Sequence, residues 1–232
     1  MDFRFSESEE KFREELTSWL NSELASRPGD DEDNSDSSWD FNLVMRKKLA
    51  EKGWLTMAWP EEYGGQSASH MMQVIFSEEM SYNRAPGRDV FGTRMMAPTL
   101  MIHGTEEQKK QFLPPVSRGD VQWCQGYSEP ESGSDLASLQ TRAVEDGDDF
   151  VVNGTKIWTS SAHRADHIMV LTRTDPDAPK HRGISFLLCD MNTPGITVNP
   201  IINMADDHGF NMVTFEDVRI PKKNLVGEQN RG

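Results

Sequence analysis

Residues 150–160 read Phe-Val-Val-Asn-Gly-Thr-Lys-Ile-Trp-Thr-Ser. The β-branched and aromatic residues on both sides of Asn153-Gly154 indicate two strands, and Asn-Gly is the strongest short signal for a β-hairpin turn. Similar strand-like runs follow at 167–172, 184–189, 196–201 and 213–220. Because no helical period separates these runs, they predict an antiparallel sandwich or barrel.

Upstream of about residue 118 the apolar residues recur every three or four positions, which is the period of a helix. This spacing predicts helices at 6–24, 41–52, 71–82 and 90–103. Capping boxes mark the start of the first helix, at Ser6 and Glu9, and of a short fifth helix, at Thr105 and Gln108. We expect the fifth helix to end before Pro114-Pro115, because proline cannot donate a helical hydrogen bond.

Together these patterns predict an α+β protein with more than one domain. An all-α bundle is expected over residues 1–120, followed by an antiparallel β-barrel or sandwich over residues 121–224. The change in period near Gly119-Asp120 sets the boundary between them.

The composition excludes several classes of protein. The chain has 232 residues, with 24 Lys and Arg against 38 Asp and Glu, so its net charge of −14 argues against a nucleic-acid surface. Six of the acidic residues fall in the stretch 28–40, which favours a solvated linker over a docking segment for a basic partner. No apolar run is long enough for a membrane span, and the first residues do not resemble a signal peptide. The sequence therefore predicts a cytoplasmic protein.

Two polar segments could bind a ligand. Residues 126–138 combine glycines with the hydroxyls of Ser128, Ser132 and Ser134, although the spacing alone favours an ordinary polar loop. In the second segment Trp158 precedes three hydroxyl residues, a pattern that suits either a flat heteroaromatic ligand or a core tryptophan at a sheet edge.

Metal and nucleophile sites are not predicted. His163 and His167 are four residues apart, but this spacing falls at a loop-to-strand transition with no third ligand near. Cys124 and Cys189 cannot form a zinc cluster, and neither has a neighbouring histidine that would activate it as a nucleophile. No metal ligand is therefore expected.

Four stretches, in this order and at this spacing, resemble the acyl-CoA dehydrogenase family over essentially the whole chain. They are Trp59-Pro-Glu-Glu-Tyr-Gly-Gly65, Gly104-Thr-Glu-Glu-Gln-Lys-Lys-Gln-Phe-Leu-Pro114, Tyr127-Ser-Glu-Pro130 with Gly133-Ser-Asp135, and Asn153-Gly-Thr-Lys-Ile-Trp-Thr-Ser160. The resemblance implies an N-terminal helical domain, a middle β domain and FAD as the redox cofactor.

The resemblance also assigns residues to the flavin: Gln125, Tyr127, Ser128, Trp158, Thr159 and Ser160. It implies that the strand 125–128 lies along the pyrimidine ring, with donors near Tyr127 and Ser128 on the carbonyl and N1 edge. Trp158 would pack on the isoalloxazine, and Ser160, in place of the frequent threonine, would hydrogen-bond N5.

For the substrate, the resemblance implies that Ser134 contacts an acyl-CoA and that residues 92–101 help to line the acyl pocket. Glu131 and Ser132 replace the usual small pair before Gly133, which bears on the pose of the substrate. An electron-transfer flavoprotein is the implied electron acceptor, in fatty-acid β-oxidation or a related pathway.

In the family, a glutamate of a C-terminal helical bundle accepts the α-proton of the substrate. Residues 225–232 match the start of the linker to that bundle, so no residue of this sequence is assigned as the base, and Glu129 is not promoted to that role. Three hypotheses follow. The chain is most of an acyl-CoA dehydrogenase, a non-catalytic subunit or binding module completed by a partner chain, or a flavin oxidase or monooxygenase on the same fold. A homo- or hetero-oligomer is expected for the full-length protein.

Overall fold

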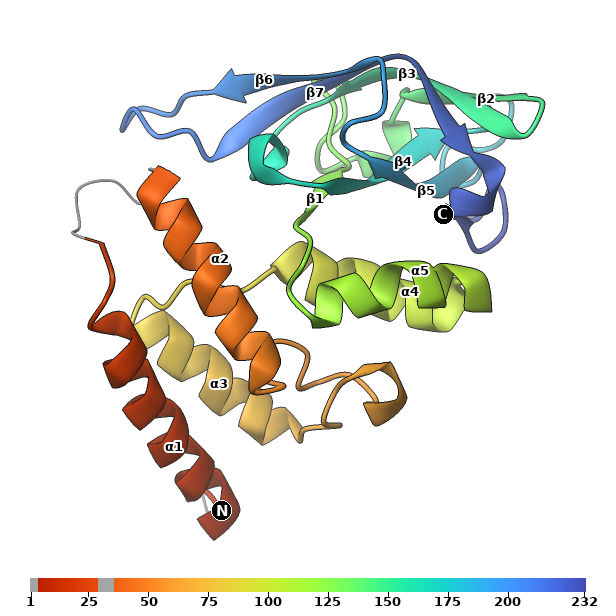
Figure 1. Ribbon diagram of the computed structural model, residues 1–232. Helices are drawn as coiled ribbons and strands as arrows, with labels where there is room; N and C mark the ends of the chain where they lie inside the picture. Colours follow the sequence, from red (N-terminus) through yellow and green to blue (C-terminus); the bar gives the residue numbers. More distant parts are fainter. Residues whose placement is uncertain (1–3, 29–35) are drawn as a thin grey trace. The chain divides into compact units, whose positions relative to one another are not determined.

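The computed structural model describes residues 4–28 and 36–232 (Figure 1). The chain forms two compact units, which we call the helical unit (residues 1–89 and 117–120) and the sheet unit (90–116 and 121–232). The expected domain ranges, 1–120 and 121–224, differ from these units in where they place residues 90–116, and they remain a prediction. Among the described residues no helix has the length and hydropathy needed to cross a membrane.

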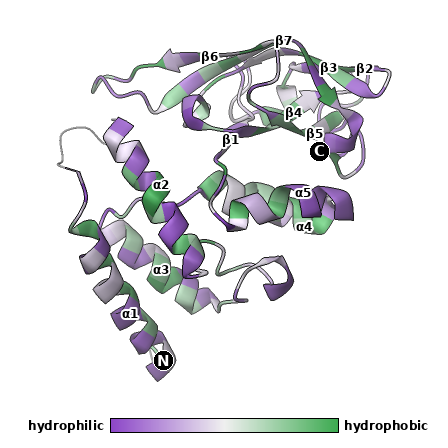
Figure 2. Cartoon of the chain, viewed as in Figure 1, coloured by the Kyte–Doolittle hydropathy of each residue, from purple (hydrophilic) through white to green (hydrophobic). Residues whose placement is uncertain are grey.

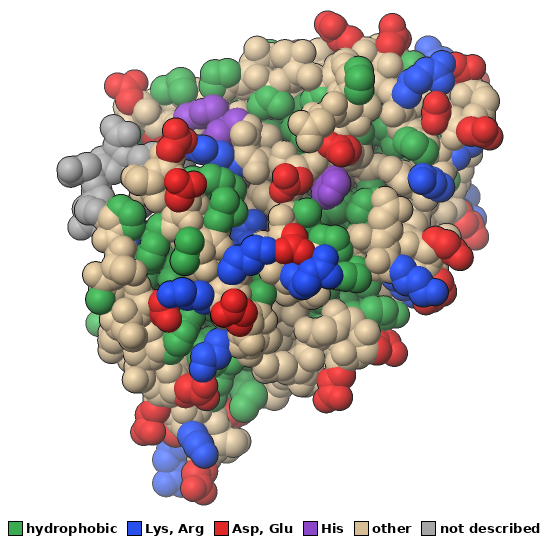
Figure 3. Space-filling model, in the orientation of Figure 1, with side chains coloured by type: hydrophobic (Ala, Val, Ile, Leu, Met, Phe, Trp, Pro, Cys, Tyr) green, Lys and Arg blue, Asp and Glu red, His purple; other side chains and the backbone are tan. Residues whose placement is uncertain are grey.

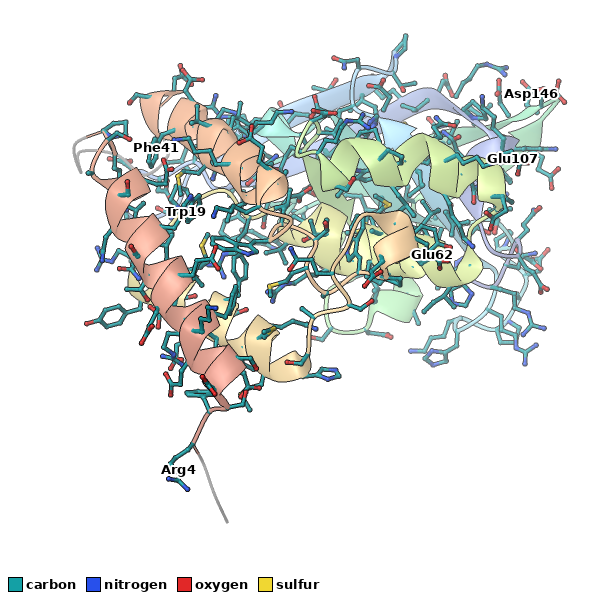
Figure 4. All side chains as sticks on the ribbon, turned by 60° about the horizontal axis from the view of Figure 1, so that its bottom comes forward. Arg4, Trp19, Phe41, Glu62, Glu107 and Asp146 are labelled. Carbon is teal, nitrogen blue, oxygen red and sulfur yellow. The ribbon has the colours of Figure 1, made fainter. Side chains whose placement is uncertain are left out.

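The helical unit contains three long helices, α1 (Glu7–Leu24), α2 (Asp36–Glu51) and α3 (His70–Tyr82), with a short 3₁₀ turn, η1 (Glu61–Tyr63), between the last two. Each long helix turns its apolar face inward (Figure 2), and the fully buried apolar side chains are Leu16, Leu20, Met45, Leu49, Ile75 and Met80. Trp19 and Phe41 pack against this core (Figure 4). The three predicted helices are confirmed.

Local signals account for the ends of these helices. Ser6 and Glu9 form the expected capping box, in which the Ser6 N–H donates to a Glu9 carboxylate oxygen at 2.7 Å. Beyond the end of α2, Gly53 has a φ of 68°, which glycine adopts at little cost. Residues 29–35 of the acidic stretch lie outside the described residues, and the stretch ends in the first turns of α2.

The sheet unit begins with helical turns. A π-helical turn, η2 (Gly92–Met96), runs into α4 (Ala97–His103), and α5 (Glu106–Ser117) follows. The predicted capping box of Thr105 and Gln108 is confirmed by reciprocal hydrogen bonds of 3.0 and 3.2 Å.

The prediction that α5 ends before Pro114-Pro115 is wrong, because both prolines lie inside the helix. They occupy its last turn, where only a few hydrogen bonds are lost. Leu113 and Val116 are only 2% and 1% exposed, and burial of apolar side chains of this size favours the turn despite that loss.

Eight strands form one sheet: β1 (Trp123–Gly126), β2 (Arg142–Asp146), β3 (Asp149–Lys156), β4 (His167–Arg173), β5 (Ile184–Asp190), β6 (Ile196–Ile201), β7 (Phe210–Pro221) and β8 (Leu225–Val226). Their order is β6-β7-β3-β2-β4-β5-β8, with β1 paired in parallel to β4. Most pairs are antiparallel and the order does not close on itself. The sheet is therefore sandwich-like, as one of the two expected forms, and is not a closed barrel.

The hairpin predicted at Asn153-Gly154 is wrong. β3 runs straight through these residues and pairs with β7, and the register shifts between Val152 and Gly154. Gly154 is needed there because a Cβ would lie 2.5 Å from the Thr141 hydroxyl oxygen and its φ is 151°. The true hairpin joins β2, which the sequence did not predict, to β3; Asp146 pairs with Asp149 at its tip (Figure 4).

Candidate functional site

A buried ion pair lies beneath the segments that the resemblance assigns to the flavin. Lys156, at the end of β3, has no exposed side-chain surface, and its Nζ lies 2.8 Å from Glu129 Oε1. The same ammonium donates to the Tyr127 carbonyl at 3.1 Å. Burial, partly offset by Glu129, lowers the pKa of Lys156 to about 8. The pair therefore ties the end of β3 to the residues that follow β1.

Glu129 is also a structural anchor. Its carboxylate accepts backbone N–H bonds from Gln140 at 2.6 Å and from Thr141 at 2.8 Å, which closes the loop 129–141 onto the sheet. Burial alone would raise the pKa of Glu129, but the Lys156 ammonium and these donors outweigh it and hold the pKa below its usual value. A carboxylate engaged in this way is not a free general base.

We expect Glu129→Gln to change the pH dependence of stability. Because the pKa of Glu129 is lower in the folded state than in the unfolded chain, its contribution is present above the unfolded value and is lost as the pH falls through the folded value. The variant should be less stable than the original chain at neutral pH, and the difference should shrink as the pH is lowered below about 4.3. Urea denaturation between neutral and acid pH measures this, and a difference that stays constant would contradict it.

The Glu129–Lys156 ion pair was not predicted from the sequence, although the sequence contains a signal for it. Lys156 lies two, four and six residues beyond Gly154, Val152 and Phe150, so it shares their inward face of β3. A lysine in phase with buried residues requires an anionic partner. The partner, Glu129, was present in another of the four quoted stretches.

Beyond Lys156 the chain forms a bulge that presents Trp158. Lys156 pairs with Val213, and Thr159 pairs with Asn211 through two backbone hydrogen bonds of 3.0 Å. The three residue steps from Lys156 to Thr159 therefore lie opposite the two steps from Val213 to Asn211. One extra residue on one strand is the defining feature of a β-bulge. Trp158 has a φ of 60° within this bulge, and its indole is 57% exposed. Trp158 is thus not a core tryptophan at a sheet edge, which was one of the two interpretations that the sequence allowed.

The structure brings the two predicted flavin segments together. The Ile157 N–H donates to the Ser128 carbonyl at 2.9 Å, so the residues after β1 lie beside the start of the bulge. In the part of the chain that the structure describes, the hydroxyls of Ser128 and Ser160 have no hydrogen-bond partner. Tyr127 is largely buried, which raises its pKa, and its ring packs edge-on against Phe186.

Other predicted residues lie outside this group. Thr159 is fully buried, and no partner for its hydroxyl exists among the described residues. Gln125 is part of β1 and half-buried. Ser134 is exposed in the loop 129–141, beside Asp135, which pairs with Lys180. Residues 92–101, expected near the acyl group, contain the π-helical turn η2, a feature often found at functional sites.

The described residues contain no cluster of metal-ligating side chains. His163 and His167 do not act together: the ring of His167 packs against Trp123, with centroids 4.9 Å apart, whereas His163 stacks on His208. Acidic and basic side chains are interspersed on the face shown in Figure 3.

An exposed indole on one segment, with hydroxyls that lack a partner among the described residues on the same and the adjoining segment, suits a flat heteroaromatic group with polar edges, because the ring offers a stacking face and the hydroxyls can donate. The residues present therefore fit an isoalloxazine ring. The fit rests on Trp158, Ser128 and Ser160.

Comparisons with known proteins agree with this arrangement. Residues 6–120 match the model of the acyl-CoA dehydrogenase N-terminal domain, and residues 124–218 match that of the acyl-CoA dehydrogenase middle domain. Acyl-CoA dehydrogenase FadE26 of Mycobacterium tuberculosis is 39% identical over all of this chain and 59% of its own length. The rat mitochondrial short-chain specific acyl-CoA dehydrogenase is 36% identical over 83% of the chain and 47% of its own length.

Solved structures give the same result. The ChsE4-ChsE5 complex of Mycobacterium tuberculosis contains a chain with a TM-score of 0.90 and 39% identity, of which this chain covers 59%. The chain thus spans about three fifths of the length of FadE26 and of this structural neighbour, and about half the length of the rat enzyme. Because both domain models match and the fold is shared with solved structures, the chain belongs to the acyl-CoA dehydrogenase family.

Proposed function

We propose that this chain carries the flavin-ring and acyl-CoA contacts of an FAD-dependent acyl-CoA dehydrogenase, which oxidises the Cα–Cβ bond of an acyl-CoA thioester. The observation that carries the proposal is the bulge that exposes Trp158 next to the free hydroxyl of Ser160. When bound, FAD would supply the hydride acceptor.

The polar residues have distinct roles in this proposal. Ser160 would donate to the flavin N5, and Ser128, with the backbone near Tyr127, would donate to the carbonyl and N1 edge. Preorganised donors at that edge stabilise the negative charge that grows there on reduction, and each such bond contributes about 1.5–3 kcal/mol when the acceptor is charged. Gln125 and Thr159 complete the two segments.

Two further parts of the chain are proposed to contact the substrate. Ser134 would meet the CoA-bearing part of the substrate, and residues 92–101 would line the acyl group. The nature of the acyl group stays open between a fatty acyl chain and a steroid side chain, because a neighbour with a TM-score of 0.90 is described as a Tcur3481-Tcur3483 steroid ACAD. We also propose an electron-transfer flavoprotein as the electron acceptor and a cytoplasmic location.

A second candidate is a subunit completed by a partner chain. Two of the structural neighbours are described by pairs of proteins, ChsE4-ChsE5 and Tcur3481-Tcur3483. A third candidate, an oxidase on the same fold, is favoured by a 26% identical neighbour described as the prolyl acyl carrier protein oxidase AnaB. The rate at which reduced flavin reacts with oxygen separates this candidate from a dehydrogenase.

Flavin titration tests the proposed site. The residues assigned here contact only the ring, whereas the resemblance places much of the adenine and pyrophosphate site in the C-terminal bundle. We therefore expect the 232-residue chain to be purified with little FAD, and to bind added FAD and riboflavin with similar, weak affinity, measured by quenching of flavin fluorescence. Stoichiometric flavin in the purified chain, or no binding of either compound, would contradict this.

Two variants test whether the flavin ring binds at Trp158. Trp158→Ala should weaken riboflavin binding about tenfold, because it removes the stacking face, which is equivalent to about 1.4 kcal/mol. Ser134→Ala should leave it unchanged, since that residue is assigned to the substrate. Equal losses in the two variants would show that the assignment of these segments is misplaced.

A further inference from the structure

Asn211 is a buried side chain that the flavin assignment does not use. It lies at the start of β7 with no exposed surface. Its backbone exchanges two 3.0 Å hydrogen bonds with Thr159, and its side-chain Nδ2 makes a third bond, also of 3.0 Å, to the Thr159 carbonyl. All three bonds act on the residue between Trp158 and Ser160.

Two histidines share the same amide. The rings of His163 and His208 stack with centroids 3.9 Å apart and an interplanar angle of 21°. His163 Nδ1 lies 3.2 Å from Asn211 Nδ2, and His208 Nε2 lies 2.8 Å from Asn211 Oδ1. Because an amide nitrogen only donates and an amide oxygen only accepts, His163 Nδ1 must accept and His208 Nε2 must donate.

The hydrogen bond to Asn211 sets the protonation state of His163. Burial, followed by the adjoining His208 and Arg164, lowers the pKa of His163. A neutral His163 is also what the hydrogen bond requires, since its Nδ1 must be free of a proton. His163 is therefore an uncharged acceptor in a directional contact.

The three side chains come from three segments of the chain. His163 is in the 3₁₀ turn η4 (Ala162–Arg164), His208 is in the loop between β6 and β7, and Asn211 is in β7. The Ser161 N–H also donates to the Gly209 carbonyl at 3.0 Å. The backbone is thus held on both sides of Ser160, whose hydroxyl has no partner among the described residues.

The same segment holds the indole. Phe210, next to Asn211, packs edge-on against Trp158 with ring centroids 6.0 Å apart, and it is itself 39% exposed. A rotation of β7 at Asn211 would therefore move both the stacking ring and the Ser160 hydroxyl.

We propose that Asn211, with His163 and His208 as its side-chain partners, is the positioning residue that fixes Trp158 and Ser160 for contact with the flavin ring. This inference rests on the proposed function. It assigns a role to three polar residues outside the two flavin segments, and none of them needs to touch the flavin.

Riboflavin titration of the 232-residue chain tests the inference, with Asn211→Leu as the main variant. Loss of the amide leaves the Thr159 carbonyl with one bond fewer and both histidines without their shared partner. We expect riboflavin affinity to fall about tenfold, or about 1.4 kcal/mol. At saturating riboflavin, the induced circular dichroism of the flavin band should also change, because the bound ring meets a displaced indole.

Two further variants keep the test decisive. His163→Phe preserves a stacked ring but removes the Nδ1 acceptor together with the other ring nitrogen, so it should fold and should show a smaller loss in the same direction. Asn203→Ala is the matched control: Asn203 accepts N–H bonds from Ala205 and Asp207 in the same loop, without a bond to Thr159. It should leave both affinity and dichroism unchanged.

The outcomes separate the inference from the proposed function. If Trp158→Ala weakens riboflavin binding but folded Asn211→Leu and His163→Phe keep full affinity and an unchanged dichroism, the positioning role is wrong and the flavin site stands. If Trp158→Ala has no effect, the flavin site itself is wrong, and the inference fails with it. A lower melting temperature with unchanged binding would reduce Asn211 to a purely structural role.

Discussion

Replacing Lys156 by methionine is expected to lower the free energy of unfolding by about 3–5 kcal/mol. The variant keeps the length and the apolar stem of the side chain, but it leaves the Glu129 carboxylate buried without its counter-charge. The Tyr127 carbonyl also loses its ammonium donor. A buried, unpaired charge costs far more than the loss of an exposed pair, because water cannot solvate it.

Urea denaturation followed by circular dichroism measures this change, and Lys180→Met is the matched control. Lys180 also pairs with a carboxylate, that of Asp135, but both side chains are more than half exposed, at 53% and 57%. Its replacement should cost about 0–1 kcal/mol. Similar losses in the two variants would mean that the Glu129–Lys156 pair is not isolated from solvent.

The Lys156 variant should also weaken flavin binding by the molecules that remain folded. The pair holds Tyr127 and the loop 129–141 on one side and the start of the bulge on the other. Asn211 holds the far side of the same bulge. The Trp158–Ser160 segment is therefore fixed at both ends by buried polar groups, while its own exposed groups remain free for a ligand.

The sequence predicted those parts of the fold that depend on local pattern. The capping box at Ser6 marks the start of α1 because all of its hydrogen bonds lie within one turn. The strand β6 lies at 196–201 as expected. The prediction of a hairpin at Asn153-Gly154 failed because a dipeptide cannot reveal that Thr141, just before β2, requires a glycine opposite it.

The candidate site, too, could be predicted only where its residues lie in local sequence motifs. The four quoted stretches led to Trp158, Ser128 and Ser160, and the structure brings their segments together through the bond between Ile157 and Ser128. Asn211 belongs to no quoted stretch. Its role depends on a pairing between β7 and a bulge 52 residues earlier, and neither the bulge nor the register can be read from the spacing of residues along one strand.

The second large effect concerns catalysis. We expect the 232 residues alone to dehydrogenate acyl-CoA at least about 10²–10⁴ times more slowly than the same residues joined to the C-terminal helical bundle that the family resemblance implies. That range is the usual cost of losing general-base catalysis. Within this chain, Glu129 cannot replace the base, because its carboxylate is committed to Lys156, Gln140 and Thr141.

Comparing three proteins decides this prediction: the chain alone, the fusion, and the fusion with the glutamate of the bundle replaced by glutamine. Bleaching of the flavin by acyl-CoA, followed in the absence of oxygen with added FAD, isolates the reductive step. If the bundle supplies only flavin affinity, both fusions bind FAD and reduce it at equal rates, and the base lies elsewhere. If it supplies the base, both fusions bind FAD, but only the unaltered one bleaches rapidly. Rapid bleaching by the chain alone at saturating FAD would contradict the prediction, and would require a base among the described carboxylates other than Glu129.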